Sequence, residues 1–221
     1  MLKQFVNHNE ANDLVVHHVD TARIYAGGKT EPIVGNVLRS CTPSKGTIVL
    51  GTKAHPSVEG GLSAQGIKSQ LKESLHAMGV TSFGEYYLHQ PDMEHAFLES
   101  LTCAHELVKD GVVGTIGMNN DHASEMERAF QLCGAHGLTR PSVYQRLYNP
   151  LNRAVGVICG CLEQVAATDF EVRVLEVFQE APRFDSHPAS RLGCLDRKLA
   201  SERRLRLHSQ IFWVQVRTPM P

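Results

Sequence analysis

Alternation between strand-like and helix-like segments over the first 150 residues is the feature that most restricts the fold of this chain. Short apolar or period-two runs indicate strands, and each is followed by apolar residues spaced as on one face of a helix. The expected strands are LVVHHVD (14–20), TIVLGTK (47–53), FGEYYLHQ (83–90), VVGTIGMN (112–119) and SVYQRLYN (142–149). This pattern predicts right-handed βαβ units and a parallel sheet, either doubly wound or closed into a barrel.

Four amphipathic helices are expected between these strands, and each has a readable start or stop. Ser63 precedes the second helix, and Gly79 and Gly111 stop the second and the third. The apolar stripes are Ile33, Val34, Val37 and Leu38 after Thr30; Ile67, Leu71, Leu75 and Met78; Phe97, Leu98, Leu101, Ala104, Leu107 and Val108; and Met126, Ala129, Phe130 and Cys133 after Ser124. No GxGxxG motif follows the first strand, which weakens a dinucleotide-binding doubly wound fold.

Composition excludes several classes of function. A formal net charge of -1 gives neither a nucleic-acid footprint nor a membrane-surface patch. No apolar run approaches the roughly 20 residues that a membrane span needs, and MLKQFVNHNEAND lacks the apolar middle of a secretory signal. The six cysteines form no CxxC pair, which is typical of reduced thiols. We therefore expect a cytoplasmic protein with no nucleic-acid or membrane partner.

The character of the chain changes after about residue 154. Residues 1–153 hold seven lysines and six arginines, whereas residues 154–221 hold one lysine and eight arginines. EVRVLEVF (171–178) reads as one more strand, but the segment that follows shows no clear strand–helix sequel. We interpret residues 1–153 as a partial barrel and residues 154–221 as a divergent segment. That segment is either a divergent helix and strand or largely disordered.

Polar side chains stand at the carboxyl end of each predicted strand, at intervals of 33, 36, 31 and 25 residues, about one βα unit each. In a (β/α)₈ barrel these strand ends open on one face, which carries the active site. The residues are Asp20, Lys53, His89, Asn119 with Asn120, and Gln145, with Tyr25 on the first loop. The sequence therefore predicts that an acid, a lysine, a histidine, a phenol and several amides converge.

This set is suited to proton transfer at a carbonyl oxygen. A tyrosine with a pKa near 10 is a poor acid at neutral pH, and we expect the Lys53 cation to lower the pKa of Tyr25. Asp20 would hold Lys53 in place and keep it charged, and His89 would orient the carbonyl or relay a proton. The amides of Asn120 and Gln145 suit a carboxamide-bearing ring such as nicotinamide, which needs one donor and one acceptor.

The motifs VDTARIY, TKAHP, YYLHQPD, IGMNN and VYQRLYNPLNR, in this order, resemble landmarks of the aldo-keto reductases. The last is most similar to the branch of aflatoxin-aldehyde and succinic-semialdehyde reductases. The resemblance covers about residues 10–153. It implies a (β/α)₈ TIM-barrel fold, NADPH as cofactor and a small carbonyl compound as substrate.

The same resemblance places the catalytic tetrad on Asp20, Tyr25, Lys53 and His89, and the nicotinamide contacts on Asn120 and Gln145. Asn119 stands where a serine is usual, and Ser57 where the closest branch has an aromatic residue. The family barrel has a strand before the one that bears the aspartate, and residues 154–221 match none of its adenosine-binding motifs. We therefore expect an incomplete barrel, without its first strand and its last one or two βα units.

Other interpretations stay open at this point. His55 and His89 together would suit a zinc hydrolase, but Lys53 and Tyr25 would then have no role, so we expect no metal. His17 and His18 alternate on a strand, which favours packing over metal binding. An incomplete barrel also exposes sheet edges. A catalytically silent remnant that acts as a binding or regulatory subunit, or that forms a homo-oligomer, is therefore the alternative to the reductase.

Overall fold

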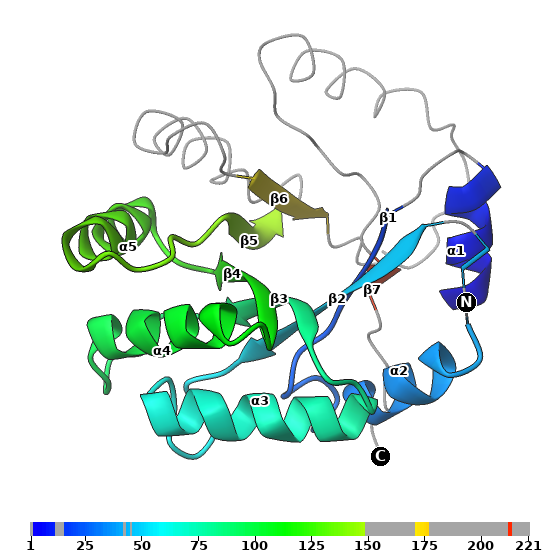
Figure 1. Ribbon diagram of the computed structural model, residues 1–221, viewed down its shortest axis with the longest axis horizontal. Helices are drawn as coiled ribbons and strands as arrows, with labels where there is room; N and C mark the ends of the chain where they lie inside the picture. The colour runs from blue at the N-terminus through cyan, green and yellow to red at the C-terminus, as the bar shows by residue number, and fades with distance from the viewer. Residues whose placement is uncertain are drawn as a thin grey trace, which may run out of the picture.

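The computed structural model describes residues 2–11, 16–41, 43–44, 46–148, 171–176 and 212–213. These residues form one curved parallel sheet with helices on its outer side (Figure 1). The strands are β1 (Val16–Asp20), β2 (Thr47–Ala54), β3 (Phe83–Leu88), β4 (Val113–Asn119), β5 (Val143–Tyr148), β6 (Glu171–Glu176) and β7 (Phe212–Trp213). Their order is β6-β5-β4-β3-β2-β1-β7, and every neighbouring pair is parallel.

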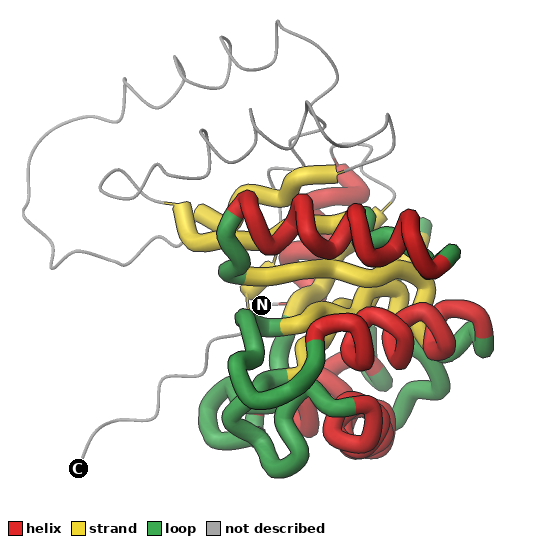
Figure 2. The backbone as a smooth tube through the Cα atoms, turned by 90° about the vertical axis from the view of Figure 1, so that its left-hand side faces the viewer, coloured by secondary structure: helices red, strands yellow, loops and turns green. Residues whose placement is uncertain are grey.

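Five helices in the described residues follow one another around the outside of this sheet. They are α1 (Leu2–Ala11), α2 (Thr30–Leu38), α3 (Ala64–Met78), α4 (Phe97–Lys109) and α5 (Ala123–His136). In Figure 1, α1 and α2 lie on the right, α3 lies below, and α4 and α5 lie on the left. The tube in Figure 2 shows helices running alongside the strands. This arrangement brings the carboxyl ends of the strands to one edge.

Local sequence signals account for most helix ends. Ser63 caps α3 by accepting a hydrogen bond from Gly66 N at 3.0 Å, and Gly79 ends α3 with a φ of 68°. Gly111, with a φ of 72°, follows α4. Thr30 is the first residue of α2 rather than a residue before it, and its hydroxyl donates to Tyr25 O at 3.1 Å. The fourth predicted helix begins at Ala123, one residue before the expected Ser124.

Helix α1 was not among the predicted elements, and its position is explained by packing. Val6 is buried in the main core cluster, and the Phe5 ring meets the His17 ring edge-on at 6.4 Å between centroids. His17 therefore faces α1, whereas His18, one residue later, faces the other side of β1. Both histidines contact protein side chains in opposite layers, which agrees with the packing role expected for them.

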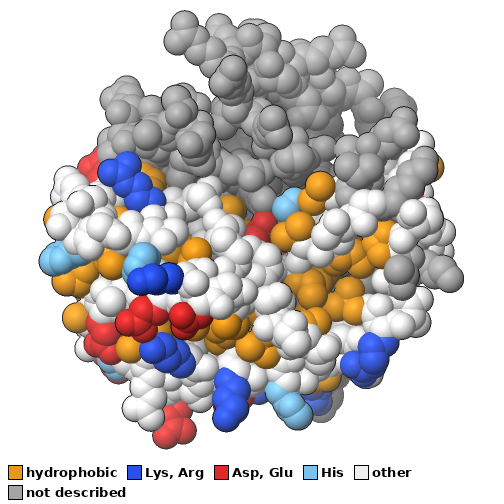
Figure 3. Space-filling view, in the orientation of Figure 1, with side chains coloured by type: hydrophobic (Ala, Val, Ile, Leu, Met, Phe, Trp, Pro, Cys, Tyr) orange, Lys and Arg blue, Asp and Glu red, His pale blue; other side chains and the backbone are white. Residues whose placement is uncertain are grey.

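Two buried clusters hold the helices against the sheet. The larger joins β1, β2 and β3 to α1–α4, and the smaller joins β4 and β5 to α4 and α5. On the face seen in Figure 3, hydrophobic side chains form a band across the middle, and basic and acidic side chains are intermixed toward the left and lower margins. The described part of that face therefore has no large patch of one charge sign. Within the same described residues, no helix is long and apolar enough to cross a membrane.

The five main predicted strands are confirmed, with ends that differ by one or two residues where they are described. The strand predicted from EVRVLEVF is also present, as β6. Most of residues 154–221, and with them the predicted domain boundary and the state of the divergent segment, lie outside the described residues. The edge of β1, where a preceding strand was expected to be missing, pairs with β7 through Val19 and Asp20.

Candidate functional site

The centre of the candidate site is a buried ion pair at the ends of β1 and β2. Lys53 Nζ binds Asp20 Oδ2 and also donates to Thr21 O at 2.8 Å. Both side chains belong to the inner face of the sheet, where Asp20 pairs in register with Gly51. Burial raises the pKa of Asp20 and lowers the pKa of Lys53, and the attraction between the two groups opposes both shifts.

Tyr25 lies on the turn between β1 and α2 and is half-buried over this pair. Its ring centroid is 5.2 Å from Lys53 Nζ, and the ring meets His89 edge-on at 5.6 Å between centroids. Burial, and then the charge of Asp20, raise the pKa of Tyr25. The expected lowering of this pKa by Lys53 is therefore wrong for the described site, because desolvation of the phenolate outweighs the nearby cation.

His89 follows β3 and completes the group. Its backbone N–H donates to Ala54 O at 2.9 Å, which holds it beside the end of β2. The His55 ring lies edge-on to it at 4.9 Å between centroids. Burial, together with the charges of Lys53 and His55, lowers the pKa of His89 to about 3, so the ring is neutral at physiological pH. Its Nδ1 atom is buried and has no hydrogen-bond partner among the described residues.

Three amides lie at the ends of β4 and β5, next in order around the sheet. Asn119 Nδ2 donates to Gln145 Oε1 at 2.9 Å, and both side chains are buried. Asn120 is exposed, has a φ of 65°, and donates from Nδ2 to His89 O at 3.2 Å. The Gln145 side chain also interacts with the Asp20 carboxylate and acts to lower the pKa of Asp20. The structure thus brings all seven predicted site residues to one edge of the sheet.

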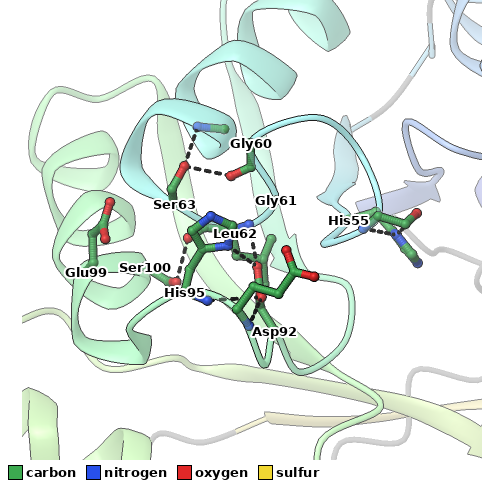
Figure 4. A network of polar contacts seen from close by, with 12 residues as sticks. His55, Gly60, Gly61, Leu62, Ser63, Asp92, His95, Glu99 and Ser100 are labelled. Atoms are coloured by element: carbon green, nitrogen blue, oxygen red, sulfur yellow. Dashed lines mark hydrogen bonds and ion pairs between the residues drawn. The ribbon is translucent and has the colours of Figure 1, made fainter.

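The loops after β2 and β3 are tied together outside this group (Figure 4). Asp92 accepts from Leu62 N at 2.7 Å and contacts His95 Nδ1 at 2.9 Å, and Ser100 Oγ donates to Leu62 O at 2.6 Å. Gly61 permits this approach, because a Cβ at that position would lie 2.7 Å from Asp92 Oδ2. These loops begin at His55 and His89. The network therefore fixes the backbone from which both imidazole rings project.

A cavity of about 250 Å³ lies beside the group, toward the amino-terminal ends of α4 and α5. Met93, Phe97, Asp121 and Arg128 are among its lining residues, whereas none of the four predicted tetrad residues lines it. The cavity is lined in part by the loop after β3, and it is distinct from the position of the four predicted tetrad residues.

Sequence reasoning missed two buried glutamates whose charges act on Lys53. Glu85 contacts His18 Nδ1 at 3.2 Å and accepts from Tyr87 OH at 2.7 Å. Glu31 is buried and accepts from Thr52 Oγ1 at 2.7 Å. A glutamate two and four residues before Tyr87 and His89 must share their face of the strand. This two-residue alternation, together with a charged residue in an otherwise apolar strand, was the sequence signal that could have identified Glu85.

No group of three or more histidine, cysteine or acidic side chains within the described ranges is arranged to hold a metal ion. His55 has a different set of contacts: its Nδ1 accepts from Ser57 N at 3.0 Å and lies 2.7 Å from Ser57 Oγ. The described contacts of the His55 ring are thus with Ser57 and, edge-on, with the His89 ring.

Comparison with known proteins identifies the family and the fold of this chain. The model of the aldo/keto reductase family matches residues 2–167. Aflatoxin B1 aldehyde reductase member 4 of Homo sapiens is 31% identical over 137 residues, which are 62% of this chain and 41% of that protein. An aldo-keto reductase of Pseudocercospora fijiensis is 34% identical over 138 residues, 62% of this chain and 46% of that protein. The chain thus spans less than half the length of these relatives.

A solved structure gives the same result for the fold. A thermostable aldo-keto reductase crystallised with the inhibitor epalrestat superposes with a TM-score of 0.61 at 21% identity, over 78% of this chain and 59% of that one. The described strands and helices are thereby confirmed as part of a TIM-barrel-type fold. Because the family model covers well over half of the residues, the chain belongs to the aldo/keto reductase family.

Proposed function

We propose that this protein reduces an aldehyde or ketone to an alcohol, with NADPH as hydride donor and Tyr25 as general acid. The observation that carries the proposal is the convergence on the Lys53 ammonium. Asp20 binds this ammonium, the Tyr25 ring lies 5.2 Å from it, and His89 packs against the same ring. An enclosed cation beside a phenol supplies the electrostatic stabilisation that proton donation by tyrosine requires.

The amides of the site fit a nicotinamide carboxamide, which offers one acceptor and two donors. Gln145 is buried beside the Asp20 carboxylate, whose pKa its side chain helps to lower, and Asn120 presents an exposed amide at the neighbouring strand end. These two residues would hold the ring, and Asn119 would hold Gln145 through their hydrogen bond. Bound NADPH would supply the hydride that reaches the carbonyl carbon.

Side chains of this protein would carry out the proton transfer and orient the carbonyl group. Because burial raises the pKa of Tyr25, the phenol keeps its proton until negative charge develops on the carbonyl oxygen. Lys53 would then stabilise the phenolate that remains, and solvent would return its proton. His89, whose pKa is lowered to about 3, would donate one hydrogen bond to the carbonyl oxygen as a neutral ring.

Two further observations support the details of the proposal. The names of several relatives describe aldehyde reductases, which favours an aldehyde as substrate here. Cys41, Cys103 and Cys133 are buried free thiols, the state that a reducing compartment maintains, which favours a cytoplasmic location.

The test is a titration of the purified full chain with NADPH, followed by nucleotide fluorescence, and then an assay of NADPH consumption with a panel of small aldehydes and ketones. We expect saturable binding and carbonyl-dependent consumption. Binding without consumption would remove the catalytic part of the proposal. Absence of both would favour the catalytically silent binding subunit instead.

A further inference from the structure

A second buried carboxylate lies on the inner face of the sheet, next to the Asp20–Lys53 pair. Glu85 is 5% exposed, and both of its oxygens have partners: Oε1 lies 3.2 Å from His18 Nδ1, and Oε2 accepts from Tyr87 OH at 2.7 Å. A buried carboxylate is retained at a free-energy cost unless other charges compensate it. The groups around Glu85 therefore determine how its charge is compensated.

Strand register places Glu85 against the tetrad. Gly51 on β2 pairs with Asp20 on one side and with Glu85 on the other. A Cβ at Gly51 would lie 3.2 Å from Asp20 Oδ1 and 3.4 Å from Glu85 Oε2. The two carboxylates thus approach the same point, and the glycine leaves the space between them open.

Tyr87 connects Glu85 to the lysine. The Tyr87 hydroxyl donates to Glu85, and the Tyr87 ring centroid is 5.3 Å from Lys53 Nζ. The ring lies directly against Gly117, where an added Cβ would be only 2.2 Å from it. Glycines at 51 and 117 therefore let a glutamate and a phenol ring fill the layer beneath the ion pair.

Three carboxylates near Lys53 all act to raise its pKa. Burial lowers the pKa of Lys53, while Asp20, then Glu85 and Glu31, raise it. Glu85 also acts with burial to raise the pKa of Asp20. The other titratable groups around the lysine are Tyr25, Tyr87 and His89, with His18 on the far side of Glu85.

We propose that Glu85 is a positioning residue of the site, a second counter-ion that keeps the Lys53 ammonium charged beneath Tyr25 and acts without touching substrate. The proposal rests on the function proposed above, because the ammonium is needed where Tyr25 releases its proton. His18 and Tyr87 contact the two oxygens of the Glu85 carboxylate and satisfy its hydrogen-bonding capacity in the buried layer, whereas the effect on Lys53 comes from the negative charge of Glu85 itself.

The test compares pH–rate profiles of Glu85→Gln and His18→Gln with the wild type. Glu85→Gln keeps the size of the side chain but removes its charge, so Lys53 should lose its proton at lower pH. The alkaline limb of the kcat profile should move down by about one pH unit, with the plateau rate preserved. His18→Gln replaces the imidazole that contacts Glu85 but leaves the Glu85 carboxylate in place. The alkaline limb of the kcat profile of this variant should therefore not move down.

Two results would overturn the assignment. One is an alkaline limb in Glu85→Gln that coincides with the wild type. The other is an equal downward shift in both variants, which would indicate repacking rather than charge. If Glu85→Gln does not fold, the double variant His18→Gln/Glu85→Gln removes both members of the contact and supplies the uncharged site.

A second measurement separates this inference from the proposed function. NMR of the protein with ¹³C-labelled lysine, with the Lys53 signal assigned by its loss in Lys53→Met, follows the titration of Lys53 directly. The midpoint should be lower in Glu85→Gln than in the wild type, whether or not the wild type reduces any carbonyl. An inactive wild type refutes the proposed function alone, and an unchanged midpoint refutes the role of Glu85 alone.

Discussion

The ammonium of Lys53 forms an ion pair with the carboxylate of Asp20, 33 residues earlier in the chain, and solvent is almost completely excluded from both. The two groups are adjacent because β1 and β2 are parallel neighbours that end at the same edge of the sheet. Each charge offsets the desolvation penalty of the other. Removing one of them therefore leaves the other buried without its main counter-charge.

This pair should be strongly coupled in stability. Asp20→Asn and Lys53→Met should each lower the free energy of unfolding by about 3–5 kcal/mol, because each removes the main counter-charge of a buried group. The double variant should lose clearly less than the sum of the two, since neither member of the pair is then left without its main counter-charge. Urea unfolding of the four proteins completes the cycle. Additive losses, within about 0.5 kcal/mol, would show that the two groups do not depend on each other.

Tyr25→Phe should abolish most of the carbonyl reduction and leave NADPH binding intact. The loss of a general acid is expected to lower kcat by about 10²–10⁴-fold. Tyr86→Phe is the matched control, because Tyr86 is buried on the outer face of β3 and its hydroxyl donates to Ile67 O at 3.1 Å. That variant should lose about 1 kcal/mol of stability and keep its rate. Equal rates in the two variants would mean that Tyr25 is not the acid.

Gly117→Ala should destabilise the protein, because its new methyl group would overlap the Tyr87 ring. Overpacking of this kind costs about 1–3 kcal/mol. Gly134→Ala is the control: Gly134 is an exposed residue of α5, and its Cβ would approach only Arg140 NH2, at 3.4 Å. There alanine should stabilise the helix by up to about 1 kcal/mol. Thermal unfolding monitored by circular dichroism distinguishes the two signs.

His89 should make stability fall on acidification. Its pKa is about 3 in the folded protein and about 6.5 when unfolded, so the unfolded chain binds more protons between these values. The contribution of this histidine is fully present above about pH 6.5 and is lost as the pH falls toward 3. His89→Gln should flatten the pH dependence in that window by a few kcal/mol. Urea midpoints measured across the window test this, and an unchanged slope would contradict it.

Asp121 should have the opposite effect at higher pH. Burial, reinforced by Glu125, raises the pKa of Asp121 to about 8, and its Oδ2 has no hydrogen-bond partner among the described residues. Between about pH 4 and pH 8 the folded protein retains a proton that the unfolded chain has lost, so stability falls as the pH rises. Asp121→Asn, which is uncharged, should be more stable than the wild type at pH 8. A variant with equal or lower stability at that pH would refute the shift.

The strands and helices up to residue 148 could be predicted because each is encoded locally, in apolar spacing and in caps such as Ser63 and Gly79. The convergence of Asp20, Lys53 and His89 could also be predicted, since parallel strands end at one edge. Helix α1 could not be predicted in this way: its short segment has no cap signal, and it is stabilised by contacts such as Phe5 with His17.

The sequence by itself determined the order of strands and helices, the family landmarks and the residue types that reach the carboxyl edge of the sheet. Only the tertiary structure decided how those residues are charged. Spacing suggested that Lys53 would lower the pKa of Tyr25, yet the folded chain raises it. The physical reason is that burial is a property of the assembled layers: desolvation depends on every neighbour brought in by β1, β2 and β3, whereas a sequence pattern shows only which charges are available.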